Sequence, residues 1–190
     1  MRSRSFVVSG TVRAVAVALL IIMAACPDRV RGETSTSTTA TLNVGPALNS
    51  VFAVAVTGAT FSAVTYRPGN SYQNATGSIV ITVTDTRSGA PGWTVTMAAS
   101  GDLRSGASSI PISNLSFRQG TIQGRDGAST GGVSRSGLTM STQPQRVLSA
   151  QNRAGTGTFD YTMPGTIRVP DGVVAGTYST TLTVTLTSGS

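Results

Sequence analysis

The chain has 190 residues and a formal net charge of +7, with 14 basic residues, all arginine, against seven acidic ones and no histidine. The absence of histidine and lysine excludes the commonest general base, the commonest zinc ligand and the amine nucleophile. Only 5% of the residues are aromatic and 11% are charged, whereas Gly, Ser and Thr are abundant. Thr and Val favour half-buried strands and Gly favours turns, so the composition indicates one all-β domain.

Residues 1–32 have the pattern of an N-terminal signal peptide. Arg2, Arg4 and Arg13 precede the apolar run 14–25, which is shorter than the roughly 20 residues of an ordinary spanning helix. The sequence therefore predicts a secreted protein. Without this segment the charge falls to about +3 and the remaining arginines are scattered, so nucleic acid is not an expected partner.

Two processing routes fit the end of this segment. Val30-Arg31-Gly32 suits a type I signal peptidase, whereas Met23-Ala24-Ala25-Cys26 is similar to a lipobox in which Cys26 is lipidated. Met at the first lipobox position and Pro27 after the cysteine favour cleavage after Gly32, and a membrane anchor is expected only if Cys26 is lipidated. Because Cys26 is the only cysteine, core burial must stabilise the exported domain without a disulfide.

The first half of the exported chain predicts strands after a flexible Ser/Thr-rich spacer at 33–40. Strand-like runs lie at 41–44, 50–56, 59–66, 77–85 and 93–97, with a turn at 67–70. Alternate residues are apolar both before and after the Pro91-Gly92 turn, which predicts a two-strand hairpin over 78–98.

The second half continues the same pattern. Short strands are predicted at 109–112 and 114–117, near an edge because Pro111 cannot donate to a ladder, and 120–137 is predicted to be an exposed loop or hairpin tip. Strands follow at 146–150, 157–161 and 166–169, and a last strand places Tyr178, Thr180, Leu182, Val184 and Leu186 on one face. Many short strands separated by turns predict a single-domain antiparallel β-sandwich over residues 41–190.

The sequence contains no catalytic constellation. Gly127-Ala128-Ser129-Thr130-Gly131 has the Gly-x-Ser-x-Gly spacing of serine hydrolases, but that chemistry requires a base and the chain has no histidine. The acidic residues show no glycosidase pair, calcium loop or metal-ligand spacing. We therefore expect no enzyme, cofactor, metal or small-molecule substrate.

Four residues are candidates for a glycan or partner contact: Trp93, Asp85, Arg87 and Tyr178. An exposed Trp93 indole could stack on a sugar ring, although the alternation with Val95 favours a core position. Tyr178 has the same two interpretations. Asp85 and Arg87 are two residues apart on one strand face, so an ion pair that braces the turn is favoured over a ligand contact.

Three blocks of the sequence together resemble the WxL surface domain family. They are 83–95, which contains Trp93-Thr94-Val95, then 147–157, and finally 167–172 with 176–186. The resemblance implies a secreted, noncatalytic domain that associates noncovalently with peptidoglycan, often beside other surface proteins. Val95 stands where the family has Leu, and Val184 stands where the second signature has Trp.

These observations lead to two hypotheses for the function. The first is a noncatalytic protein of the cell surface that binds wall glycan or a surface protein complex. The alternative is a pilin-like or coat-like structural domain, in which the amphipathic last strand pairs with a neighbouring subunit.

Overall fold

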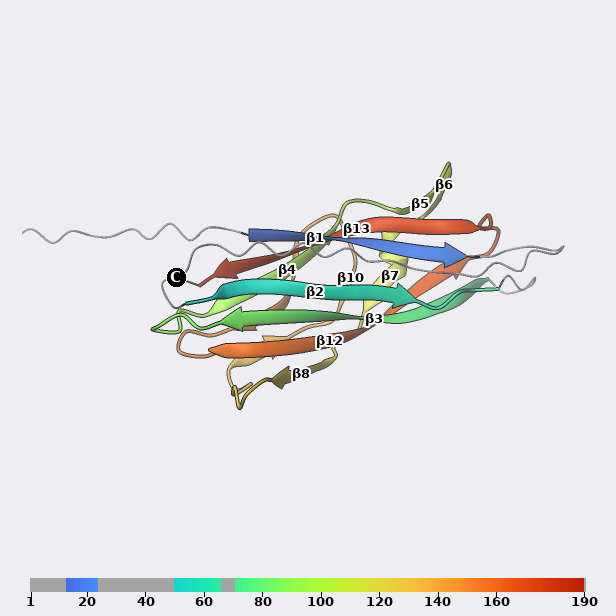
Figure 1. Ribbon diagram of the computed structural model, residues 1–190. Helices are drawn as coiled ribbons and strands as arrows, with labels where there is room; N and C mark the ends of the chain where they lie inside the picture. Colours follow the sequence, from blue (N-terminus) through green and yellow to red (C-terminus); the bar gives the residue numbers. More distant parts are fainter. Residues whose placement is uncertain (1–12, 24–49, 66–70, 190) are drawn as a thin grey trace, which may run out of the picture.

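The computed structural model describes residues 13–23, 50–65 and 71–189, and within 13–23 it describes the backbone (Figure 1). The predicted cleavage sites, Cys26, the spacer 33–40, the strand 41–44 and the turn 67–70 lie outside the described residues. The strands are β1 Arg13–Met23, β2 Phe52–Phe61, β3 Tyr72–Asp85, β4 Trp93–Ala99, β5 Leu103–Ser105, β6 Ser108–Ile110, β7 Leu115–Phe117, β8 Thr121–Gly124, β9 Val133–Arg135, β10 Leu138–Thr139, β11 Gln145–Ala150, β12 Gly157–Pro170 and β13 Gly176–Ser188, with a 3-10 turn at Ile112–Asn114.

The strands form two antiparallel sheets that pack face to face, which confirms the predicted all-β sandwich. One sheet has the order β6-β5-β13-β4-β11-β9, with β1 on the other edge of β13. The second has the order β10-β7-β12-β3-β2, with β8 also paired to β12. The part of the chain that the structure describes contains no helix long and apolar enough to cross a membrane.

Strict alternation of apolar and hydroxyl residues produces the core. In β13 the residues Tyr178 to Leu186 alternate between buried and half-buried, as predicted, because successive strand residues face opposite sides of a sheet. The same pattern buries Ile79, Ile81 and Val83 in β3 and the alternate residues of β4. The two inner faces together form one hydrophobic core.

The predicted hairpin over 78–98 is wrong. β3 pairs with β2 and β12, whereas β4 pairs with β13 and β11, so the segment between them crosses from one sheet to the other. Alternation specifies which residues are buried, and a sandwich buries the same residues whether two consecutive strands lie in one sheet or in two.

Two further boundaries differ from those expected. The strands predicted at 50–56 and 59–66 are largely one strand, β2, and those predicted at 157–161 and 166–169 are one strand, β12. β12 continues through Pro164, which is exposed, and Gly165, where a Cβ would lie 2.8 Å from the rings of Phe61 and Phe117. Within 120–137, predicted to be a loop, β8 and β9 join different sheets.

Candidate functional site

Trp93 lies in the core at the start of β4. Its side chain is 1% exposed, and its ring centroid lies 6.0 Å from that of Phe159. The indole Nε1–H donates a hydrogen bond of 2.9 Å to the carbonyl oxygen of Gly155. A buried indole with a satisfied donor is a packing residue, and its faces are occupied by protein.

Asp85 and Arg87 form a buried brace at the end of β3. The Arg87 Nε and Nη2 atoms each donate to one Asp85 carboxylate oxygen at 2.8 Å, and the Arg87 backbone N–H donates to Oδ1 at 3.1 Å. The guanidinium also lies 3.5 Å from the ring centroid of Phe52 and donates to the Ser188 hydroxyl. Asp85 is completely buried, so this bidentate pair joins β2, β3 and β13.

Three segments pack beside Trp93, and we call this region the Trp93 end, comprising residues 86–92, 151–156 and 188–189. Trp93 pairs with Ala150 of β11 on one side and with Ser188 of β13 on the other. Arg153 N–H donates to the Ala90 carbonyl at 2.7 Å, and Gly189 N–H donates to the Gly92 carbonyl at 3.0 Å. The first two sequence blocks, 83–95 and 147–157, therefore meet the end of β13 in one packed corner of the sandwich.

Gly155 is a residue of this corner that sequence reasoning did not single out. It has φ of +75°, and a Cβ there would lie 2.7 Å from Trp93 Nε1 and would also meet Ala150. A side chain at this position would therefore displace the indole. The signal was the glycine-rich stretch 153–157, in which Gly157 also has positive φ.

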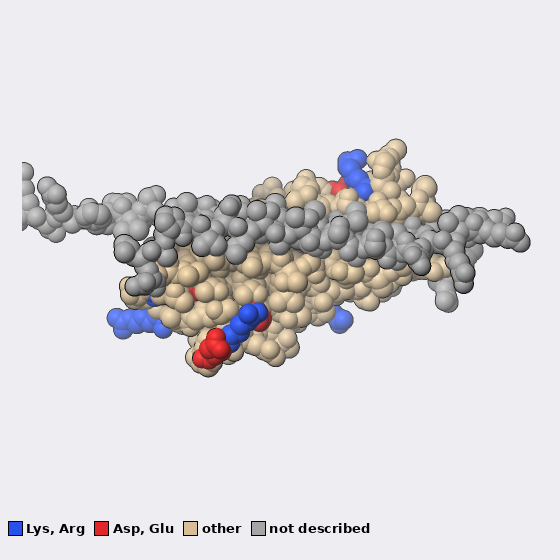
Figure 2. Space-filling model, viewed as in Figure 1, with Lys and Arg blue, Asp and Glu red and all other residues tan. Residues whose placement is uncertain are grey.

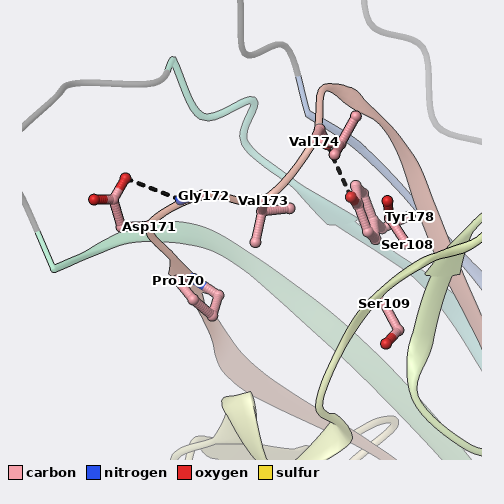
Figure 3. Close-up of a pocket in the computed structure, with 8 residues that line it drawn as sticks. All are labelled: Ser108, Ser109, Pro170, Asp171, Gly172, Val173, Val174 and Tyr178. Atoms are coloured by element: carbon pink, nitrogen blue, oxygen red, sulfur yellow. Dashed lines mark hydrogen bonds between the residues drawn. The ribbon is translucent and has the colours of Figure 1, made fainter.

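Tyr178 lies at the other end of β13 beside a surface depression of about 310 Å³, which we call the Tyr178 pocket (Figure 3). The Tyr178 hydroxyl donates a hydrogen bond of 2.8 Å to the Val174 carbonyl, and the side chain is completely buried. Val174 is 62% exposed, and the Asp171 Oδ1 atom accepts the Gly172 N–H at 2.9 Å. The pocket is lined by Ser108, Ser109, Pro170, Asp171, Gly172, Val173, Val174 and Tyr178.

The Tyr178 pocket combines two features that suit a sugar. Its hydroxyl and carboxylate groups can exchange hydrogen bonds with sugar hydroxyls, and the Val173 and Val174 side chains offer an apolar surface. The other three candidate residues lie at the opposite end of β13, so the structure does not bring the four predicted site residues together.

The described residues do not form a metal-binding cluster. No group of three or more His, Cys, Asp or Glu side chains that could hold a metal occurs within residues 50–65 and 71–189. Ser129 is exposed in a loop, where its hydroxyl accepts the Gly131 N–H at 3.2 Å. On the face shown in Figure 2, the charged side chains of the described residues form a few small groups, in some of which opposite charges lie side by side.

A comparison with protein families matches residues 28–189 to the WxL domain surface cell wall-binding family. The chain belongs to this family. No curated protein and no solved structure matches the chain. Membership in the WxL family places the chain among surface domains that bind the cell wall, and it confirms the resemblance inferred from the three blocks.

The two WxL signatures lie on adjacent strands of this chain. Val95 of the first signature pairs with Leu186 of the second, and Val184 pairs with Met97. All four side chains are buried. Val184, which stands where the second signature has Trp, is thus a core residue here. A valine in place of tryptophan at this position alters the volume packed in the core and not a surface available to a ligand.

Proposed function

We propose that the processed chain is a secreted, noncatalytic surface protein that associates noncovalently with peptidoglycan through the Tyr178 pocket. The family match over residues 28–189 carries the proposal of wall association. The position of the pocket is supported by its concave shape and by its mixture of hydroxyl, carboxylate and apolar groups.

The chemistry of the chain supports a binding role over a hydrolytic one. The chain lacks histidine and lysine, and the described acidic side chains with ion-pair partners, Asp85 and Asp160, are each held by an arginine. A carboxylate held in this way belongs to a structural ion pair. Binding at the Tyr178 pocket therefore relies on hydrogen bonds and apolar contact with the sugar.

Cosedimentation of the exported protein with purified peptidoglycan tests the proposal. We expect the wild-type chain to pellet, and we expect the double substitution Ser109→Ala with Asp171→Ala to weaken binding by roughly ten-fold or more, because hydrogen bonds to a charged group contribute about 1.5–3 kcal/mol. The matched control is Asn152→Ala with Arg153→Ala, which changes two exposed residues at the Trp93 end.

The control variant should pellet as the wild type does. Failure of the wild-type chain to pellet would contradict wall association itself. If the pocket variant pelleted as the wild type does and the control variant did not pellet, the contact with peptidoglycan would lie at the Trp93 end. Circular dichroism of each variant verifies that the fold is retained.

A further inference from the structure

The long edge of β13 is covered by a strand that lies outside the family domain. β1 pairs antiparallel with β13 over its whole length, from Arg13 opposite Leu186 to Met23 opposite Gly176. It also contacts β2, the edge strand of the other sheet, so β1 lies between β13 and β2 along one side of the sandwich (Figure 1). The family match begins at residue 28, after β1 ends.

Removal of residues 1–32 would leave β13 and β2 as two adjacent open edges. β4 and β5 pair with the opposite edge of β13 and cannot replace β1. Among the described residues, no other strand pairs with the β1 side of β13 or with the outer edge of β2. The buried rows of both strands border this opening, including Val54 and Val56 of β2 and Leu182 of β13.

These two edges lack the features by which natural sheets prevent pairing. Gly176–Ser188 and Phe52–Phe61 contain no charged residue and no proline. Exposed edges are ordinarily protected by charges, prolines or a covering segment, and here β1 is the covering segment. An uncharged edge of 11 residues, Gly176 to Leu186, that is opened by processing is a template for another strand.

The length of the chain ahead of β2 limits which antiparallel strand can replace β1 on the edge of β13. Phe52 lies at the Ser188 end of β13, because Arg87 contacts both residues. An antiparallel strand of the same copy that replaced β1 would run from this end to the Gly176 end and would then return to Phe52. The 11 residues of β1 span about 36 Å, so the two passes together require about 22 residues.

Cleavage after Gly32 leaves only residues 33–51, about 19 residues, ahead of β2. These residues are too few for both passes within one copy, but they are enough for a single pass along another copy. The segment is also suited to pair as a strand, since Ala40, Leu42 and Val44 alternate with hydroxyl or amide residues and Glu33 is its only charge.

We propose that residues 33–49 of a second copy add as an antiparallel strand to the edge of β13 that β1 occupies in the unprocessed chain, which links processed copies head to tail. The occupant is a strand with alternating apolar residues and one charged side chain, Glu33, and the contact is heterologous, so it extends to a chain of subunits. The proposal depends on signal cleavage and is independent of wall binding.

Disulfide trapping tests this contact, because the chain cleaved after Gly32 contains no cysteine. The full gene is expressed in an exporting host, and mass spectrometry of the secreted protein gives its N-terminus. Thr183→Cys in β13 is combined in turn with Thr39→Cys, Thr41→Cys and Asn43→Cys, and each protein is oxidised. The matched control combines Asn43→Cys with Thr96→Cys in β4, both of whose edges are paired.

We expect at least one of the three pairs to give a ladder of disulfide-linked multimers on a non-reducing gel, and we expect the control pair and the single variants to give none. A monomer with an internal disulfide would overturn the proposal in favour of a parallel strand from the same copy. Dimers of Thr183→Cys alone would overturn it in favour of β13 pairing with itself. Absence of any crosslink, or an exported protein that retains residues 13–23, would also overturn it.

Discussion

At Trp93, a single large side chain depends on groups that come from distant parts of the sequence. Its donor is satisfied by Gly155, its backbone pairs with Ala150 and Ser188, and its ring packs on Phe159. The corner that these groups form is built around the indole. Its value to the protein is packing and one buried hydrogen bond, and its contact with a wall glycan stays a prediction.

Asp160 is the residue whose electrostatics can be tested most directly. The Arg125 guanidinium donates to both of its carboxylate oxygens, at 2.6 and 2.9 Å, and the Thr82 hydroxyl donates to Oδ1 at 2.7 Å. The hydrogen bonds from Arg125, and then that from Thr82, lower the pKa of Asp160 against the opposing effect of burial. The unfolded chain should have the ordinary value near 3.9.

A carboxyl group whose pKa is lower in the folded state stabilises the fold above the unfolded pKa, and this stabilisation is lost as the pH falls through the folded pKa. We therefore expect the stability difference between wild type and Asp160→Asn to be about 1 kcal/mol or less at pH 7 and to shrink below about pH 4. Urea unfolding at pH 7, 4 and 3 measures it.

The control for this experiment is Asp171→Asn, which removes one negative charge away from Arg125. A difference between Asp160→Asn and wild type that stayed constant or grew as the pH fell would show that the carboxylate of Asp160 does not stabilise the fold.

At the scale of elements, the crossing between β3 and β4 is the feature that organises the sandwich. β3 of one sheet ends at Asp85, and β4 of the other sheet begins at Trp93. Gly89, Ala90 and Gly92 between them all have positive φ. Gly92 is also enclosed, because a Cβ there would lie 2.7 Å from the Ala150 carbonyl oxygen, whereas a Cβ at Gly89 would meet nothing within 4 Å.

Gly89 and Gly92 therefore allow the strain of a positive φ to be measured without and with a steric clash. Gly89→Ala should cost about 1–2 kcal/mol of unfolding free energy, the ordinary strain of a left-handed residue. Gly92→Ala should cost about 3 kcal/mol or more, because the same strain is accompanied by a clash with the backbone of the loop after β11. Chemical denaturation of both variants measures the difference, and equal losses would show that the crossing loop adjusts freely.

The sequence predicted most of this architecture at the level of single strands. The alternation in 93–97 and 178–186 specified which residues are buried, and the spacing of Asp85 and Arg87 specified their ion pair. It did not specify which strands are partners, because pairing between β4 and β13 depends on contacts more than 80 residues apart in the chain.

The site was less predictable than the fold for a related reason. Trp93 and Tyr178 stand out by residue type, but both are completely or almost completely buried. The Tyr178 pocket is built from Ser108 and Ser109 together with residues 170–174 and Tyr178. No sequence pattern predicts that these segments meet, because they come together only when β6 and the turn after β12 lie beside β13.

At the scale of the whole molecule, the sandwich closes by different means on its two sides. Short strands close one side, where β9 ends one sheet and β10 ends the other. On the other side the long strands β2 and β13 depend on β1, which belongs to the segment predicted to be removed. The stability of the processed protein should therefore depend on what replaces β1.

If a second copy supplies that strand, folding and association are linked, and the thermal midpoint must rise with protein concentration. Above the dissociation constant, a ten-fold increase in concentration adds about 1.4 kcal/mol, which corresponds to roughly 3–5 °C for a domain of this size. Scanning calorimetry of the processed protein over a hundred-fold range of concentration measures the shift. Leu42→Asp with Val44→Asp puts two charges into the donated segment, so this variant should melt at a lower and concentration-independent temperature. A wild-type midpoint that does not change with concentration would mean that each copy closes its own edge.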